Sequence, residues 1–383
     1  MNDKKKIDVV FNCSTNVVGG GIQNSVNFIK QVIENNGFDL AWFFLLSPQV
    51  YSQVKYILSE DNFYIALNSP ASSLKTRKEI FKLVCAIAPK LVYTSAGPAY
   101  ISFPVRHVMG CSNPYILGAS GYAYKLYGNR FEQLKRRLKS VYQRYKIKSA
   151  DAWIAQTEAS EKSLRNIVGK EKLIHVVYNS VSKDFLDYLN AIELSKDMIT
   201  NTNVVKKILV PTAYYKHKDL EKIPDVVALL CNKYSHQIEV HFTVQSHDDF
   251  SNIMHIAREK KVEQAFKNRG AFAHQDAMNI YKQYDAILQP SALEVFSTSY
   301  IEAMATLKPL IVPSLNFAES ICEDYAHYYE IGNIDSYADA IHSAITDCDI
   351  KKRYDIALRI VGKYGSQEQR VNKIISLVKS YMA

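Results

Sequence analysis

Residues 290–313 read PSALEVFSTSYIEAMATLKPLIVP. Glu294 and Glu302 stand eight positions apart in this stretch, the first in a loop after a predicted buried strand and the second in the first turns of the next predicted helix. Open α/β sheets bind ligands outside the carboxyl ends of their strands, which is where both carboxylates fall. An ionised carboxylate only accepts hydrogen bonds, so the pair favours a ligand rich in hydroxyl groups.

Strand-like and helix-like segments alternate on the N-terminal side of this stretch, as they do in parallel sheets with crossover helices. One round has predicted strands at 206–210, 238–244, 264–272 and 286–289, with helices near 219–232, 249–259 and 275–284. An earlier round has predicted strands at 7–13, 40–46, 90–94 and 152–156, with a helix at 22–35. The pattern predicts an α/β protein with two Rossmann-like, doubly wound domains.

These two rounds set the expected domain limits. We place an N-terminal domain at 1–183, a polar and strand-poor linker at 184–205, and a C-terminal domain at 206–365. A length of 383 residues suits two domains of ordinary size. Two such domains joined by one linker leave a cleft between them.

Composition narrows the class of protein. Hydrophobic residues make up 48% of the chain and charged residues 22%, as in soluble globular proteins. The apolar run Leu40–Leu46 is far shorter than the ~20 residues that span a bilayer. The N-terminal MNDKKKIDVVF lacks the long apolar core of a signal peptide, and the six cysteines are too scattered for a zinc or redox motif. We expect a cytoplasmic protein with reduced thiols.

Positive charge is the other compositional feature. The formal net charge of +9 favours anionic partners, whether nucleic acid, phosphate or an acidic lipid surface. Residues 130–148 hold eight lysines and arginines against one acid, Glu132, with apolar residues near helical spacing. The favoured interpretation is a surface helix whose apolar stripe packs on its own sheet. The alternative is an electrostatic dock for an anionic membrane, which would make the protein peripheral on the inner membrane face.

The stretch 290–313 resembles the carboxylate signature of retaining GT-B glycosyltransferases, the group 1 or family 4-like enzymes of bacterial polysaccharide biosynthesis. Val295 and Ser297 stand where that family has glycines. The resemblance covers nearly the whole chain and is most specific from about 274 to 313. The matching blocks are Pro290-Ser291, Glu294–Ser297, Glu302–Ala305 and Lys308–Ile311.

The resemblance implies a GT-B fold, with two Rossmann-like domains facing a central cleft. The N-terminal domain would bind the acceptor and be completed by a C-terminal helix at 366–383. The C-terminal domain would bind a nucleotide-sugar donor, with a UDP-sugar favoured over a GDP-sugar. The activity implied is hexosyl transfer with retention to a glycan or polyprenyl-linked acceptor, for products such as O-antigen or capsule.

The same resemblance implies roles for individual residues. Glu302 would hold the ribose hydroxyls and Glu294 the donor hexose, while Lys218 would stabilise the diphosphate. Ala213 stands where the family has an arginine, so Lys216 or His217 would supply that charge. The predicted catalytic residues are Glu294, Lys218 and His107, and the predicted donor-binding residues are Glu302, Lys216, Phe296, Ser297, Thr298, Gly20 and Gly21.

Several of these candidates have a plainer interpretation. Gly19–Gly21 lie between the first predicted strand and helix, where backbone N–H groups can approach a phosphate, but a tight turn explains them equally well. A lone histidine such as His107 is more often structural than functional. Asp347-Cys348-Asp349 has the D-x-D form of metal-dependent sugar transferases, but its place between predicted helices indicates helix punctuation. We predict no metal and no other cofactor.

Three rival functions share parts of this pattern. A nucleotide-sugar epimerase of the same fold would use the donor without an acceptor. A basic nucleic-acid-binding protein would explain the charge and leave the glutamate pair idle, so we expect no nucleic acid partner. An NAD-dependent oxidoreductase would share the sheet topology, but this sequence lacks the G-x-G-x-x-G fingerprint of that class.

Overall fold

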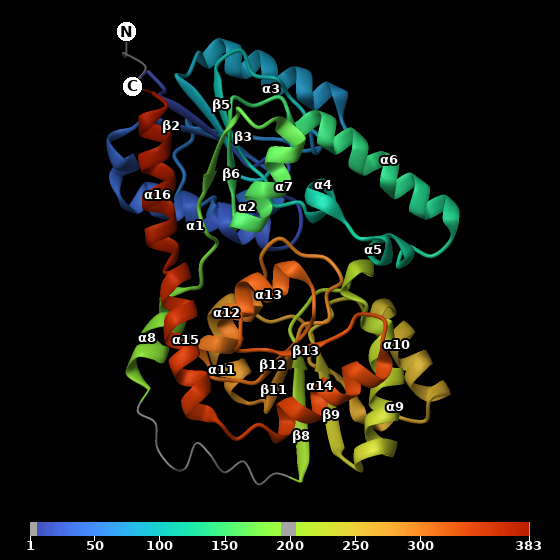
Figure 1. The fold of residues 1–383 in the computed structure, drawn as a ribbon. Coiled ribbons are helices and arrows are strands. Elements are labelled where there is room, and N and C mark those ends of the chain that lie inside the picture. Colours follow the sequence, from blue (N-terminus) through green and yellow to red (C-terminus); the bar gives the residue numbers. More distant parts are fainter. Residues whose placement is uncertain (1–5, 193–203, 383) are drawn as a thin grey trace. The chain divides into compact units, whose positions relative to one another are not determined.

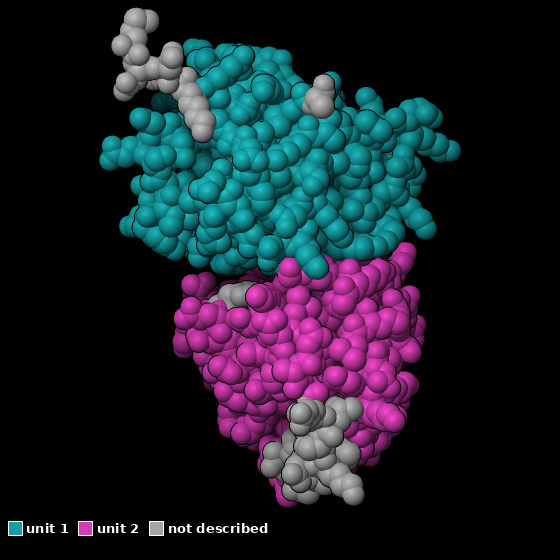
Figure 2. Space-filling model, turned by 90° about the vertical axis from the view of Figure 1, so that its left-hand side faces the viewer, with its two compact units in different colours: residues 1–119, 134–179, 367–383 teal, residues 120–133, 180–366 magenta. Residues whose placement is uncertain are grey.

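The computed structural model describes residues 6–192 and 204–382 of the chain. The chain divides into two compact units, which Figure 2 colours separately. Unit 1 comprises residues 1–119, 134–179 and 367–383, and unit 2 comprises residues 120–133 and 180–366. Each unit is built around one parallel sheet with helices on its faces (Figure 1).

Unit 1 contains a seven-stranded sheet in the order β3-β2-β1-β4-β5-β6-β7, with every neighbouring pair parallel. β1, β2, β4 and β6 are buried along their whole length, because short apolar runs suit a strand covered on both faces. The strands are β1 (Val9–Asn12), β2 (Trp42–Leu46), β3 (Phe63–Ile65), β4 (Leu91–Thr94), β5 (Arg106–Gly110), β6 (Ala152–Ala155) and β7 (Leu173–Val176).

The last helix of the chain belongs to unit 1. It buries Val371, Ile374, Ile375 and Val378 in the apolar cluster that also contains strands β1 and β2. The helices that carry residues of unit 1 are α1 (Gly20–Glu34), α2 (Pro48–Val54), α3 (Leu74–Ile87), α4 (Pro114–Gly118), α6 (Arg130–Ile147), α7 (Glu158–Val168) and α16 (Gln367–Ser380), with the short η1 (Asn36–Asp39). The first four residues of α6 group with unit 2.

Unit 2 repeats the arrangement with six parallel strands in the order β10-β9-β8-β11-β12-β13. The strands are β8 (Val205–Val210), β9 (Gln237–Phe242), β10 (Phe266–Asn268), β11 (Ala286–Leu288), β12 (Leu310–Pro313) and β13 (His327–Tyr329). The helices are α5 (Gly121–Lys125), α8 (Lys183–Ala191), α9 (Ile223–Tyr234), α10 (His247–Glu259), α11 (Ala277–Lys282), α12 (Thr298–Ala305), α13 (Asn316–Cys322), α14 (Ile334–Thr346) and α15 (Ile350–Tyr364). Single 3-10 turns are η3 (Lys216–Lys218), η4 (Leu220–Lys222), η5 (Glu263–Ala265) and η6 (His274–Asp276).

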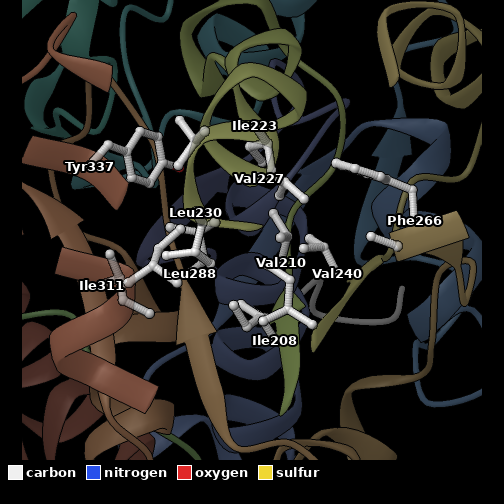
Figure 3. Packing of buried hydrophobic residues seen from close by; sticks show 14 of the residues in the cluster. Ile208, Val210, Ile223, Val227, Leu230, Val240, Phe266, Leu288, Ile311 and Tyr337 are labelled. Carbon is white, nitrogen blue, oxygen red and sulfur yellow. The ribbon is translucent and has the colours of Figure 1, made fainter. Parts of the chain in front are cut away.

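The main core of unit 2 lies between its sheet and helices α9 and α14. Figure 3 shows Ile208 and Val210 of β8 directed toward Val227 and Leu230 of α9. Pro224 stands in the first turn of α9, where its missing N–H costs no helical hydrogen bond. Helix α9 therefore begins soon after β8 ends, and the turns η3 and η4 between them lie at the carboxyl end of β8.

Both strand orders confirm the predicted α/β class with two Rossmann-like domains. In each sheet the chain winds first to one side and then to the other, so the switch falls between β1 and β4 in unit 1 and between β8 and β11 in unit 2. Ligands of open α/β sheets bind outside the carboxyl ends of the strands at such a switch point. Part of the predicted linker, residues 184–191, is helical, and 193–203 lie outside the described residues.

Within residues 6–192 and 204–382, no helix has the length and apolar character needed to cross a bilayer.

Candidate functional site

The switch point of unit 2 brings together two loops that are far apart in sequence. One follows β8 and ends in η3, and the other follows β11 and leads into α12. The Gln289 side-chain amide donates to the Pro211 carbonyl at 3.0 Å, and the Ala292 backbone N–H donates to the His217 carbonyl at 2.7 Å. These hydrogen bonds fix the two loops against each other.

Lys218 and Glu294 form an ion pair across the two loops. Their side chains are only 12% and 15% exposed, so water screens the pair weakly. Removing one partner of such a pair leaves a charge that is poorly solvated. The structure thus pairs Lys218, the residue predicted to bind the diphosphate, with Glu294, the first of the two predicted carboxylates.

Glu302 lies in the middle of α12 and is 6% exposed. The Tyr281 hydroxyl on α11 donates to its Oε2 at 2.7 Å. Burial, and then the nearby carboxylate, raise the pKa of Tyr281 well above its usual value, so the phenol remains a neutral donor. Tyr281 is a positioning residue that the sequence analysis missed, because nothing in its spacing links it to Glu302.

The loop between the two glutamates does without the family's glycines. None of its residues adopts a positive φ, and Ser297 stands at the N-cap position of α12 with φ −102° and ψ 117°, without a capping hydrogen bond from its side chain. Phe296 is buried and packs edge-on against Tyr364 of α15, with ring centroids 5.0 Å apart. Ser297 is also buried, and the half-buried Thr298 begins the helix. The N-terminal turn of α12 therefore lies next to Glu294, where its dipole favours an anion.

Asp219 directly follows Lys218 and ends the turn η3 that carries this lysine. It is 6% exposed and adopts a left-handed backbone, with φ 51° and ψ 35°. The Tyr122 hydroxyl, from α5, donates to its Oδ2 at 2.6 Å. Burial raises the pKa of Asp219 above its usual range. Residues 120–133 thus supply unit 2 with a side chain that holds the Lys218 turn, and no local sequence signal marks this contact.

The neighbouring cation, Lys216, has different partners. Its Nζ lies 3.3 Å from Glu221 Oε1 and 3.2 Å from the Tyr214 hydroxyl, and its side chain is 49% exposed. The His217 ring stacks on Tyr215 with centroids 5.6 Å apart. Lys218, rather than Lys216, therefore pairs with Glu294 at the switch point.

Gly20 and Gly21 lie at the switch point of unit 1, in the first turn of α1. Gly19 before them takes φ 66°, a conformation that favours glycine. The Asn16 amide donates to the Gly21 carbonyl at 3.2 Å and to Ser25 Oγ at 2.7 Å. These polar contacts order the loop at the edge of the unit 1 sheet where the strands have their carboxyl ends. Lys218, in contrast, belongs to unit 2.

His107 is an interior residue of unit 1, which argues against its predicted catalytic role. It is 1% exposed, its Nε2 lies 2.8 Å from Thr94 Oγ1, and its ring packs edge-on against Phe103. Burial lowers the pKa of His107 to about 3. It stands near the start of β5, whereas ligands approach the carboxyl ends of the strands. We assign it to the core.

The aspartates of the D-x-D sequence have structural partners. Asp347 lies 2.7 Å from Arg353 Nη1, and Asp349 caps α15 by accepting from the Lys352 N–H at 3.0 Å. Among the residues that the structure describes, no group of three or more His, Cys, Asp or Glu side chains could hold a metal ion.

Comparison with known families identifies the second half of the chain. Residues 197–359 match the family described as "Glycosyl transferases group 1". This part, which is less than half of the chain, is therefore similar to the group 1 glycosyl transferases, a family of transferase enzymes. A comparison with curated protein sequences finds no significant match.

Solved structures support the GT-B-like fold. A glycosyltransferase from Rickettsia africae superposes with TM-score 0.70 at 17% identity, covering 99% of each chain. Anabaena HepE, in complex with UDP and glucose, gives 0.68 at 15%, covering 98% of this chain and 100% of its own. A trehalose-6-phosphate synthase, studied for glycosyl transfer with retention, gives 0.66 at 11%, covering 97% and 99%. These identities establish the fold alone.

Proposed function

We propose that the protein transfers a hexose from a UDP-sugar to an acceptor hydroxyl with retention of anomeric configuration. The observation that carries the proposal is the Lys218–Glu294 ion pair at the switch point of unit 2, with Glu302 on the adjoining helix. One cation and two carboxylates suit a ligand with a diphosphate at its centre and hydroxyl-bearing sugars on both sides.

Each group has one chemical task in this proposal. Glu302, held by Tyr281, accepts hydrogen bonds from the ribose hydroxyls, and Glu294 accepts those of the hexose. During transfer the bond between the anomeric carbon and the diphosphate oxygen breaks, and a bond to the acceptor oxygen forms. Lys218 and the N-terminus of α12 stabilise the charge that the leaving diphosphate acquires. The acceptor's proton leaves with the diphosphate or passes to water, and no metal ion or other cofactor takes part.

The choice of donor and stereochemistry rests on related folds. HepE is seen with UDP and glucose, and the trehalose-6-phosphate synthase was studied for transfer with retention. Unit 1, with the ordered Gly19–Gly21 loop at its own switch point, is the proposed acceptor-binding part. The proposed acceptor is a glycan or a polyprenyl-linked glycan, as in O-antigen or capsule synthesis, which places the enzyme in the cytoplasm or at the inner membrane face.

Nucleotide binding by the wild type and by Glu302→Gln tests the donor site. We expect UDP and UDP-sugars to raise the melting temperature of the wild type more than GDP or CDP do, because a ligand that binds only the folded state stabilises it. Hydrogen bonds to a charged group are worth about 1.5–3 kcal/mol, so Glu302→Gln should weaken UDP binding by about ten- to a hundredfold. Thermal shift and isothermal titration calorimetry measure both effects.

The matched control is Glu259→Gln, which changes a 61% exposed carboxylate on α10 of the same unit. It should leave UDP binding unchanged. Wild-type UDP affinity in the Glu302→Gln protein would contradict the assigned role. A product of inverted anomeric configuration, measured by NMR, would remove retention from the proposal, and sugar inversion without acceptor would favour an epimerase.

A further inference from the structure

Helix α6 exposes an apolar ridge to solvent. We expected this apolar stripe to pack on the sheet of its own unit, and its exposure shows that prediction to be wrong. The positions of α6 that are buried are Ser140, Gln143 and Ile147. The exposed side chains of the ridge are Phe131 (72%), Leu134 (54%), Leu138 (62%), Val141 (62%), Tyr142 (40%) and Tyr145 (69%).

Polar contacts on the opposite face of α6 hold the ridge outward. Arg144 donates to the Ile116 carbonyl at 2.8 Å, and the Gln143 amide donates to the Tyr100 hydroxyl at 3.0 Å. The Arg136 guanidinium lies over the Tyr115 ring, 3.7 Å from its centroid. Two of the arginines counted in the basic segment therefore serve to fix the helix in unit 1.

The remaining bases border the ridge on both sides. At about 100° of rotation per residue, Lys135, Lys139 and Lys146 fall along one flank of the ridge. Arg130 and Arg137 fall along the other flank, and Lys148 follows the end of the helix. The helix of 18 residues is about 27 Å long, so the ridge presents an apolar line between two basic lines over that length.

We propose that α6 docks the enzyme on the surface of an anionic phospholipid membrane. A helix with an apolar face and lysine or arginine flanks lies in the membrane interface, with its apolar side chains between the headgroups and its bases against anionic lipids. The ridge inserts Phe131, Leu134, Leu138 and Tyr145, while Arg137 and Lys139 contact lipid phosphates. This proposal rests on the proposed function, because docking on a membrane would bring the enzyme to a lipid-linked acceptor.

Two other occupants fit the surface less well. A second copy of the chain would place basic flanks against basic flanks, and like charges at close range repel. A nucleic acid would neutralise the bases through its phosphates but would leave the apolar ridge without a partner. An anionic bilayer complements both the charge and the apolar area.

Flotation of the full-length protein with phosphatidylcholine vesicles, with and without phosphatidylglycerol, tests the docking. The wild type should bind only the anionic vesicles. Arg137→Glu with Lys139→Glu should weaken that binding by about thirtyfold or more, because each base near the surface contributes about 1 kcal/mol. Leu134→Gln with Leu138→Gln should weaken it by about tenfold or more, because two leucines no longer leave water.

Matched variants control for charge and for exposed apolar area. Lys162→Glu with Lys373→Glu makes the same change of charge on exposed positions of α7 and α16. Leu173→Gln with Leu358→Gln alters other exposed leucines, which are 56% and 36% accessible. Both should bind anionic vesicles as the wild type does, and thermal melting checks that every variant is folded.

Three results would overturn the docking proposal. The first is no wild-type binding to anionic vesicles, or equal binding to neutral ones. The second is a dimer in analytical ultracentrifugation that Leu134→Gln with Leu138→Gln abolishes. The third is binding to duplex DNA or RNA that depends on Arg137 and Lys139 when vesicles do not bind. Vesicle binding is measured without donor or acceptor, so its failure is separate from a failure of UDP binding or transfer.

Discussion

At the scale of single residues, the polar partners of the proposed donor site come from separate parts of the chain. Lys218 and Glu294 are 76 positions apart, and the parallel order of β8 and β11 brings their loops together. The next cation, Lys216, lies only two positions before Lys218 yet pairs with Glu221. The turn at 216–218 therefore places Lys218 against Glu294 and Lys216 against Glu221.

Lys218→Gln should lower kcat of sugar transfer by about a hundred- to a thousandfold, because it removes one preorganised group that stabilises charge in the transition state. Lys216→Gln is the matched control and should change kcat by less than about threefold, since its exposed ion pair contributes little. A continuous assay of UDP release measures both. Comparable losses in the two variants would contradict the separate roles that the ion pairs assign.

Local spacing in the sequence predicts Glu294 and Glu302, whereas the tyrosines that support the site depend on how separate elements pack. Glu294 and Glu302 are marked by their spacing around a strand end, which is local information. The partners Tyr281 and Tyr122 depend on how α11 and α5 pack, which no spacing records. His107 was predicted as catalytic because its place after a strand-like segment resembled a family position, whereas its burial is decided by the sheet around it.

At the scale of elements, the short segment at residues 120–133 has an unusual position. It follows α4 of unit 1 in sequence but groups with unit 2, where the Tyr122 hydroxyl reaches Asp219. A side chain added at Gly332 would meet the Tyr122 ring at 3.2 Å, so the ring sits closely over that turn. The segment therefore stabilises the turn that presents Lys218.

Tyr122→Phe should destabilise unit 2 by about 1–3 kcal/mol, because it leaves the buried Asp219 carboxylate without this donor. Hydrogen exchange with mass spectrometry should show faster exchange in peptides covering 211–222. Tyr56→Phe, on a 69% exposed tyrosine of unit 1, is the control and should leave exchange unchanged. Unaltered exchange at 211–222 in Tyr122→Phe would show that the segment does not hold the turn.

Fully buried strands were the most predictable elements. Apolar runs marked β1, β2, β4, β6 and β11, because a strand covered on both faces is continuously hydrophobic. β5 begins with the exposed Arg106 and β7 is at most half-buried, so neither has such a run. The exposure of the α6 ridge was also beyond prediction, since spacing shows that a stripe exists but not what covers it.

At the scale of the whole molecule, the chain returns to its first unit at the end. α16 adds four buried side chains to a core that is otherwise formed by residues of the first half. The chain contains two tryptophans, Trp42 and Trp153, and both are buried in unit 1. Tryptophan fluorescence therefore reports on unit 1 separately from unit 2.

Ending the chain at Ser366 should unfold unit 1. Each lost aliphatic side chain contributes about 1.5–3 kcal/mol, so four of them approach the 5–15 kcal/mol that stabilises a typical domain. We expect a red-shifted tryptophan emission and a lost fluorescence melting transition. A control chain that ends at Met382 keeps α16 together with Tyr381 and Met382, which pack on the same core, and should melt as the full-length protein does. A native emission spectrum in the shorter chain would show that unit 1 does not depend on α16.

The Lys218–Glu294 ion pair also bears on product release. The pair is internal to unit 2. In the proposed mechanism, an incoming UDP-sugar would separate it and give each member a new partner, the diphosphate for the lysine and the hexose for the carboxylate. After transfer the hexose has gone, and Glu294 is left beside the negative diphosphate of UDP. Reforming the internal ion pair then competes with the product for Lys218. On the proposed mechanism, the contact that neutralises the resting site would thereby favour the donor over its leaving group and speed product release.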